Sequence, residues 1–293
     1  GIDRWNSDVK KFYNSIKKVF MRNIILGRTN EEVSAISLGT WAFGGASMSG
    51  KVSVGWEGQT ESDSKRALLA AWENGINHWD TADVYGDGKS ETIIGEMWND
   101  IPRRDIFLAT KVGWDKGPFS NYYEPKHMVR NIERSLKNLK TDCVDVIYLH
   151  HCNFGKNGEY FDEALDVLTD FKNQGGLRFI GLSDWSNSRI MKYIKMCDPD
   201  VVQPYRNVMD DGFIKSGLCS YINKNNLGVC FFSPIKHGLL TGKYDKPTSF
   251  ELGDHRSGVK DFADQNVIDK MKQNKILLEK RFTEHKYPVM RGL

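Results

Sequence analysis

The sequence predicts an α/β fold: a (β/α)8 TIM barrel with an N-terminal β-hairpin, whose eighth strand and helix are missing from the 293 residues. Short apolar runs alternate with amphipathic helical patterns, which is typical of parallel strands joined by right-handed crossovers. Seven such runs recur at roughly regular intervals, and this favours a barrel over an open sheet. Periodicity alone leaves a doubly wound sheet as the alternative.

The expected strands begin with a hairpin and continue as barrel strands. Asn23–Gly27, a turn and Val33–Ser34 make up the expected hairpin. The seven apolar runs that follow are Ala35–Gly39, Ile76–Trp79, Ile106–Thr110, Val144–Leu149, Phe179–Leu182, Val201–Gln203 and Val229–Phe232.

The segments between these runs carry helix signals. Thr60 and Asp63 resemble a capping box, in which side chains bond the first free backbone amides of a helix. Pro125 lies where a helix starts, because the first helical residue needs no amide hydrogen. The apolar stripe Phe161–Phe171 is closed by Gly175–Gly176, as a helix C-terminus often is.

The pattern changes after the seventh run. A long polar loop follows Phe232, then one more helix near Asn266–Phe282, and we find no eighth strand before Leu293. We therefore expect an open end instead of a closed seven-stranded barrel. No Pro- or Ser-rich linker divides the chain, so residues 21–293 are expected to form a single, C-terminally incomplete barrel domain.

Residues 1–20 are expected to form a separate N-terminal extension with helical spacing of its apolar residues. Lysines interrupt these apolar residues throughout, unlike the continuous apolar stretch of a signal peptide. Two explanations remain open: an added docking helix, or in part a remnant of recombinant expression, since Gly1 precedes the segment and Met21 follows it.

Composition excludes several classes of protein. The formal net charge is +3, with 41 basic and 38 acidic residues, which is too balanced for electrostatic binding of nucleic acid or a membrane. The 5 cysteines show no CxxC spacing and are interpreted as reduced thiols of a cytoplasmic protein. No apolar run approaches membrane-spanning length.

Four chemically active side chains follow three consecutive expected strands. Asp80 and Tyr85 come after the second strand, Lys111 ends the third, and His150 ends the fourth. Because the C-terminal strand ends of a barrel form its active-site face, these side chains are expected to converge. Each residue alone has an ordinary structural explanation, such as a helix cap, an ion pair or a buried histidine. These explanations are weaker for the four residues taken together.

The chemistry of the four residues is coherent. A tyrosine with a pKa of about 10 is a poor acid at neutral pH, and a nearby ammonium group, Lys111, would lower that pKa. Asp80 would hold Lys111 in place and keep it charged. His150 would hydrogen-bond a substrate carbonyl and help to pass a proton. Such a set polarises a carbonyl group while a hydride arrives from elsewhere.

At these residues the chain resembles the aldo-keto reductase family. The motifs of the resemblance run in order from strand one to strand seven, about residues 23–258, and they are Leu38–Trp41, Gly75–Gly86, Ala109–Lys111, Asp145–His150, Gly181–Ser186, Gln203, Ser233–Ile235 and Gly238–Tyr244. The resemblance implies an NADPH-dependent reductase of aldehydes or ketones with a small-molecule substrate and no metal. Asp80, Tyr85, Lys111 and His150 are then its catalytic residues.

The resemblance also implies a cofactor site. Ser183, Asp184 and Gln203 would bind the nicotinamide carboxamide, and Phe232 would stack on the ring. Further residues would line the cofactor mouth or hold the pyrophosphate through backbone amides, namely Thr40, Trp41, Ser233, Pro234, Ile235, Gly238 and Leu240. Asp184 replaces the family's usual asparagine, and Phe232 replaces a common tyrosine. Trp41, Trp114 and Tyr122 are candidates for the substrate pocket.

The family's adenosine and 2′-phosphate contacts are expected to fall beyond Leu293, so the chain is expected to bind its cofactor weakly.

Three other motifs are rejected. Gly86–Glu91 lacks the third glycine of a dinucleotide fingerprint, Gly238–Tyr244 is one residue short of a P-loop, and His150–Cys152 lacks a second metal-ligand cluster.

Two alternatives to a reductase remain. One is a regulatory or scaffold protein that retains this fold and cofactor site, as channel β-subunits do, and the catalytic residues do not separate it from an enzyme. The other is a barrel enzyme of unrelated chemistry. The sequence leaves the physiological substrate and the oligomeric state open.

Overall fold

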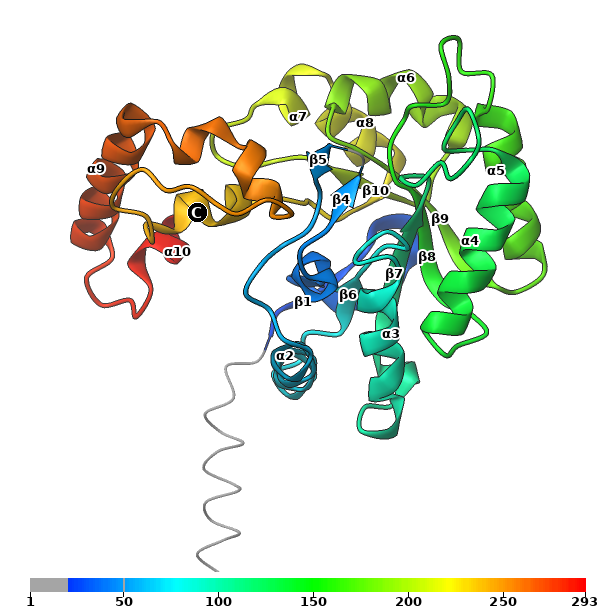
Figure 1. Ribbon diagram of the computed structural model, residues 1–293, viewed down its shortest axis with the longest axis horizontal. Helices are drawn as coiled ribbons and strands as arrows, with labels where there is room; N and C mark the ends of the chain where they lie inside the picture. Colours follow the sequence, from blue (N-terminus) through cyan, green and yellow to red (C-terminus); the bar gives the residue numbers. More distant parts are fainter. Residues whose placement is uncertain (1–20, 50) are drawn as a thin grey trace, which may run out of the picture.

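The computed structural model describes residues 21–49 and 51–293. The expected extension over residues 1–20 lies outside this described part. The chain forms a curled parallel sheet with helices packed along its outer side, and the helices α9 and α10 lie apart from the sheet (Figure 1). Among residues 21–49 and 51–293, no helix is long and apolar enough to cross a membrane.

Seven parallel strands form the central sheet, in the order β3-β6-β7-β8-β9-β10-β11. They are β3 (Ser37–Gly39), β6 (His78–Asp80), β7 (Phe107–Val112), β8 (Val144–Leu149), β9 (Leu177–Asp184), β10 (Val201–Pro204) and β11 (Gly228–Val229). Within the described residues, β3 and β11 are the two edges of this sheet. The expected (β/α)8 class, with seven strands and an open end, is confirmed.

Nine α-helices follow or flank the strands in the described part of the chain. They are α2 (Glu61–Glu73), α3 (Lys89–Gly95), α4 (Pro125–Asn138), α5 (Phe161–Asn173), α6 (Asn187–Cys197), α7 (Gly212–Lys215), α8 (Leu218–Asn225), α9 (Gln265–Arg281) and α10 (Pro288–Gly292). The expected caps are present, because the Thr60 side chain accepts a hydrogen bond from the Asp63 amide at 3.1 Å and Pro125 is the first residue of α4.

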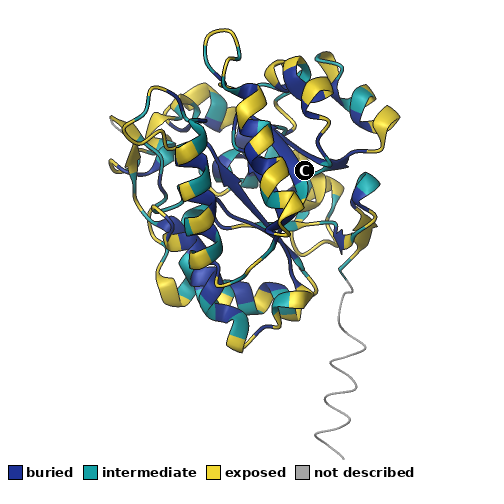
Figure 2. Cartoon of the chain, turned by 90° about the vertical axis from the view of Figure 1, so that its right-hand side faces the viewer, coloured by how far each residue is buried: buried dark blue, intermediate teal, exposed yellow. Residues whose placement is uncertain are grey.

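Burial explains why the central strands are continuous apolar runs. Every residue of β7 and β8 is buried, as expected for parallel strands covered on both faces. The helices have one buried face and one exposed face (Figure 2). The apolar stripes of α4, α5 and α6 therefore pack on the sheet and help to fix the position of the strand ends.

Two antiparallel hairpins accompany the sheet. The expected hairpin is confirmed as β1 (Asn23–Ile25) paired with β2 (Glu32–Ser34). A second hairpin, β4 (Met48–Ser49) with β5 (Val52–Ser53), was not predicted, since its strands are too short to show a period. Segments beyond β11 form a small separate core, which contains Leu239, Leu240, Phe262, Ile268 and Met271.

Candidate active site

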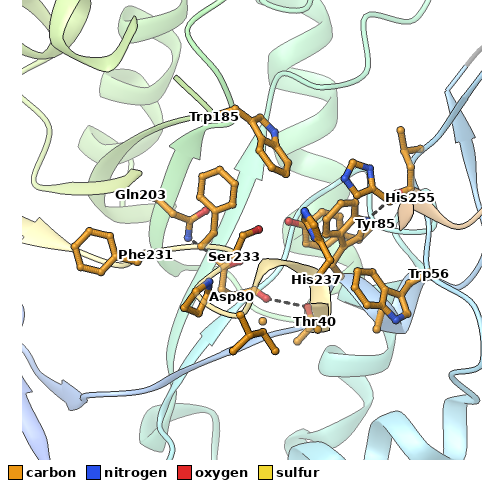
Figure 3. Close-up of a pocket in the computed structure, with 18 of the residues that line it drawn as sticks. Thr40, Trp56, Asp80, Tyr85, Trp185, Gln203, Phe231, Ser233, His237 and His255 are labelled. Carbon is orange, nitrogen blue, oxygen red and sulfur yellow. Dashed lines mark hydrogen bonds between the residues drawn. The ribbon is translucent and has the colours of Figure 1, made fainter. Parts of the chain in front are cut away.

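The strand ends bring the four predicted catalytic residues to one cavity. Asp80 ends β6, Lys111 lies near the end of the neighbouring β7, and His150 follows β8 directly. Tyr85 lies in the loop between β6 and α3. All four line a cavity of about 860 Å³, and Figure 3 shows Asp80 and Tyr85 on its wall.

A close approach of two backbone segments positions Tyr85. Gly86 has a φ of +63°, and a Cβ atom there would lie 2.4 Å from the Gly44 carbonyl oxygen. A Cβ atom on Gly44 would in turn lie 2.5 Å from the Gly86 nitrogen. Because only glycine fits at both positions, the loop that carries Tyr85 packs directly on the turn after β3.

Lys111 connects the other members of the set. Its Nζ donates hydrogen bonds to Asp80 Oδ1 at 2.6 Å, to the Thr81 carbonyl at 2.7 Å and to the Tyr85 hydroxyl at 3.2 Å. The side chain of Lys111 is 2% exposed. With all three ammonium hydrogens engaged, Lys111 is held in one position against the phenol.

The electrostatics keep a proton on Tyr85. Burial raises the pKa of the Tyr85 phenol above its usual value, and the Lys111 charge opposes that shift. Burial alone would lower the pKa of Lys111, but Asp80 and Tyr85 raise it above the usual range. Lys111 therefore lowers the pKa of Tyr85 as expected, but burial raises it by more. Tyr85 is a protonated phenol beside an ammonium group.

His150 completes the cavity wall as a neutral imidazole. Burial and the Lys111 charge hold the pKa of His150 well below its usual value. Its ring centroid lies 6.1 Å from that of Tyr85 and 5.2 Å from that of Trp114. Within the described part of the chain, His150 Nδ1 is buried without a hydrogen-bond partner. A neutral ring at this place can hydrogen-bond a ligand but adds no charge.

Nine of the eleven residues predicted to bind the cofactor line the same cavity: Thr40, Trp41, Ser183, Gln203, Phe232, Ser233, Pro234, Ile235 and Gly238. Asp184 and Leu240 do not line it. The Asp184 carboxylate accepts hydrogen bonds from the backbone amides of Cys152 at 2.7 Å and Ser186 at 2.6 Å. It therefore holds together the loops that follow β8 and β9. Leu240 is buried in the small core beyond β11.

A hydrogen-bond network links the polar members of this group to the four predicted catalytic residues. Gln203 Nε2 donates to Asp80 Oδ2 at 2.7 Å, so the two carboxylate oxygens of Asp80 bind Gln203 and Lys111 separately. Ser183 Oγ donates to the Gln203 carbonyl at 2.9 Å, and Thr40 Oγ1 donates to the Asp80 carbonyl at 2.9 Å. The strand ends of β6, β9 and β10 are thereby fixed to one another.

The loop after β11 is tightly curved. Ser233, Lys236, His237 and Gly238 have φ values of +56°, +46°, +58° and +92°. The amides of Gly238 and Leu240 both donate to the Ile235 carbonyl, at 3.1 and 3.2 Å. Left-handed residues in succession make a concave backbone turn of the kind that binds anions, although these two amides are turned inward.

Sequence reasoning missed one wall of the cavity. This wall is aromatic and basic, and it consists of Trp56, Trp185, His237, His255 and Arg256. Trp41 joins it, since its ring lies 4.8 Å from that of His255 and is stacked on that of Tyr85 at 6.0 Å. These residues come from four separate loops, so no spacing in the sequence links them.

Asp83, on the loop that carries Tyr85, gives a stability prediction. Its carboxylate is fully buried, and neither oxygen has a hydrogen-bond partner in the described part of the chain. Burial, with Glu91 nearby, raises the pKa of Asp83 well above its usual value. The Asp83 carboxyl group therefore binds a proton more tightly in the folded state than in the unfolded state. As the pH rises above about 4, the pKa of this group in the unfolded chain, the group increasingly destabilises the fold.

We expect Asp83→Asn to raise the free energy of unfolding at pH 8 by about 1–3 kcal/mol, because the neutral amide avoids a buried unpaired charge. The gain should shrink as pH falls toward 5. Urea denaturation at both pH values measures it. Asp166→Asn, an exposed change on α5, is the control, and we expect little change in stability at either pH. A less stable Asp83→Asn at pH 8 would contradict the prediction.

Comparison with known proteins places this chain in a family. The profile of the "Aldo/keto reductase family" matches residues 35–289. The chain is 31% identical over 232 residues to the aldo-keto reductase YhdN of Bacillus subtilis, which covers 78% of this chain and 66% of that protein. The chain thus spans about two thirds of the length of this relative.

Two further proteins are similar to the chain. A probable voltage-gated potassium channel subunit beta of Oryza sativa is 29% identical over 258 residues, which is 83% of this chain and 73% of that protein. The structure of the glycerol dehydrogenase AKR11B4 from Gluconobacter oxydans superposes with a TM-score of 0.69 at 27% identity, and it covers 91% of this chain and 80% of that one. The chain belongs to the aldo/keto reductase family.

Proposed function

We propose that this protein is an oxidoreductase that reduces the carbonyl group of an aldehyde or ketone with NADPH, and that Tyr85 is its general acid. The observation that carries the proposal is the position of Lys111 Nζ, 2.6 Å from Asp80 and 3.2 Å from the Tyr85 hydroxyl on the wall of the cavity. We further propose that residues 21–293 act as one domain and that the protein is cytoplasmic.

The side chains have separate tasks in this proposal. Bound NADPH would supply the hydride that the carbonyl carbon takes up. Tyr85 donates its phenolic proton to the carbonyl oxygen, which gives the alcohol, and regains a proton from water. Lys111 stabilises the phenolate that forms, and Asp80 keeps Lys111 in place and charged. His150, which is neutral, hydrogen-bonds the carbonyl oxygen and orients it toward the phenol.

The residues of the cavity fit a nicotinamide cofactor. Gln203 places an amide beside Asp80, and the Ser183 hydroxyl lies on the Gln203 carbonyl. Both side chains line the cavity, where they would bind a carboxamide. Phe232 offers a flat face on the same cavity for a nicotinamide ring. The pyrophosphate would lie along the concave turn that starts at Ser233, although the Gly238 and Leu240 amides of that turn are bonded to the Ile235 carbonyl. We leave Asp184 and Leu240 out of this set because neither lines the cavity.

The test is turnover with a panel of aldehydes and ketones and with both nicotinamide cofactors. We expect oxidation of NADPH, followed by its absorbance, with at least one carbonyl compound, and a higher kcat/KM for NADPH than for NADH. A preference for NADH would overturn the choice of cofactor alone. Absence of turnover with every compound, in a protein that binds NADPH, would overturn the reductase.

A second candidate is a regulatory protein that keeps the fold and binds the cofactor. The similarity to the rice channel subunit beta favours it. Its expected signature is NADPH binding, measured by quenching of tryptophan fluorescence, without carbonyl turnover. The Tyr85–Lys111 pair can be kept in either kind of protein, so carbonyl turnover is the measurement that separates the two candidates.

A further inference from the structure

A second, smaller pocket adjoins the main cavity. Its volume is about 190 Å³, and it is lined by Trp114, Tyr122, His151, Asn153, Asp184, Trp185 and Arg189. Trp114 and Trp185 also line the main cavity, so the two spaces share a wall. A cavity of roughly 150 Å³ holds a benzene molecule, and the side pocket, as we call it, therefore admits a group of about the size of one ring.

The hydrogen bonds of His151 determine which of its nitrogens carries the proton. The Asn153 amide donates to His151 Nδ1 at 3.2 Å, so Nδ1 has a lone pair there. Burial lowers the pKa of His151 to about 4, which keeps the ring neutral near pH 7. The single ring proton is then on Nε2. No residue in the described part of the chain accepts a hydrogen bond from that Nε2–H group.

The charges of the pocket balance. Arg189 lies 3.4 Å from Asp184 Oδ1 and is half exposed, so its charge is offset by a carboxylate. Both oxygens of Asp184 already accept backbone hydrogen bonds. A charged ligand of either sign would meet one attractive and one repulsive partner in this ion pair. An uncharged acceptor is favoured because its entry removes no ionic charge from water.

Aromatic rings make up the rest of the wall. The ring of His151 lies 4.7 Å from that of Tyr122 and 5.6 Å from that of Trp114, and the Trp114 ring also contacts His150 at 5.2 Å. Trp114 is therefore the partition between the catalytic histidine and the side pocket. A flat group that enters past Trp114 presents its polar edge to His151.

We propose that the side pocket binds the part of the substrate remote from the reacting carbonyl, and that it selects an uncharged, flat group whose oxygen accepts a hydrogen bond from His151 Nε2–H. An amide or a second carbonyl has this chemistry. That this ligand is a substrate rests on the proposed reductase function. The binding of such a group does not depend on that function and is tested separately.

The binding test uses three compounds of one shape: benzamide, benzoate and benzylamine. Calorimetric titration of the full chain should show the tightest binding for benzamide. His151→Phe keeps a flat ring but removes the donor, and it should weaken benzamide roughly three- to tenfold, the range of one net hydrogen bond. His151→Gln restores a donor and should recover part of the loss. His127→Phe, another buried histidine that lines neither cavity, is the matched control.

The kinetic test compares ω-acetamidoalkanals of increasing length with alkanals of the same length. At one length the amide should be preferred through a lower KM, and His151→Phe should abolish that preference by raising the KM of the amide to that of the alkanal of the same length. Equal binding of the three benzene derivatives, or an unaffected benzamide affinity in His151→Phe, overturns the side pocket. Benzamide selectivity without reduction of any aldehyde instead overturns the reductase and retains the pocket.

Discussion

Tyr85→Phe is expected to lower kcat/KM for carbonyl reduction by at least the roughly 10²–10⁴-fold that a positioned general acid contributes. The substitution keeps the ring that stacks on Trp41 at 6.0 Å and removes the hydroxyl that accepts a hydrogen bond from Lys111. The fold and the affinity for NADPH should therefore change little. Steady-state kinetics, with cofactor binding measured by tryptophan fluorescence, separates the two effects.

A matched control distinguishes the loss of the proton from a general effect of removing a phenol. Tyr221 lies on α8, away from the cavity, and Tyr221→Phe should retain full turnover. Near-full turnover in Tyr85→Phe would mean that another group gives the proton. The proposed mechanism would then be wrong, and the regulatory candidate would be favoured.

The strands that the sequence predicted best are those whose burial leaves a continuous apolar run. Val144–Leu149 was predicted with its observed bounds, because every residue of β8 is buried. The last run was predicted as Val229–Phe232, but β11 ends at Val229. The chain beyond it stays beside β10 through single contacts, such as the Phe232 amide on the Pro204 carbonyl, which apolar periodicity cannot distinguish from a regular ladder.

The same contrast holds for the site. Asp80, Lys111 and His150 could be predicted to converge, because neighbouring parallel strands place their ends together. Asp184 also ends a strand, yet its side chain turns toward the amides of Cys152 and Ser186. A carboxylate meets unpaired backbone donors there, and local hydrogen bonding decides its direction. Strand order predicts where a residue lies, while its nearest donors decide where its side chain points.

The aromatic wall of the cavity illustrates the limit of sequence reasoning. His237 and His255 lie on different loops, and their rings are 4.9 Å apart. Nothing local holds them together, since the loop around His255 is anchored through Asp254, which accepts a hydrogen bond from the Glu57 amide at 3.1 Å. A contact that joins residues about 200 positions apart leaves no periodic trace in either segment.

Lys111→Met is expected to be the most disruptive single change at the site. It removes the charge that opposes the upward shift of the Tyr85 pKa, so the phenol becomes a weaker acid. It also leaves Asp80 without its cation, and loss of one partner of a buried ion pair costs about 3–5 kcal/mol of stability. We expect a loss of kcat/KM of at least about 10²-fold together with a lower melting temperature. Lys89→Met, an exposed lysine nearby, should change neither.

The double variant Tyr85→Phe with Lys111→Met tests whether the two residues serve one proton transfer. If Lys111 acts through the phenolic proton of Tyr85, the charge has nothing to act on once that proton is gone. The double variant should then be little worse in kcat/KM than the worse single variant, as in other sets of catalytic residues that work as a unit. Losses that multiply would mean that Lys111 stabilises the transition state by a route independent of Tyr85. Melting temperatures of all three variants show whether unfolding contributes, and kinetics measured well below the lowest of them keep the comparison valid.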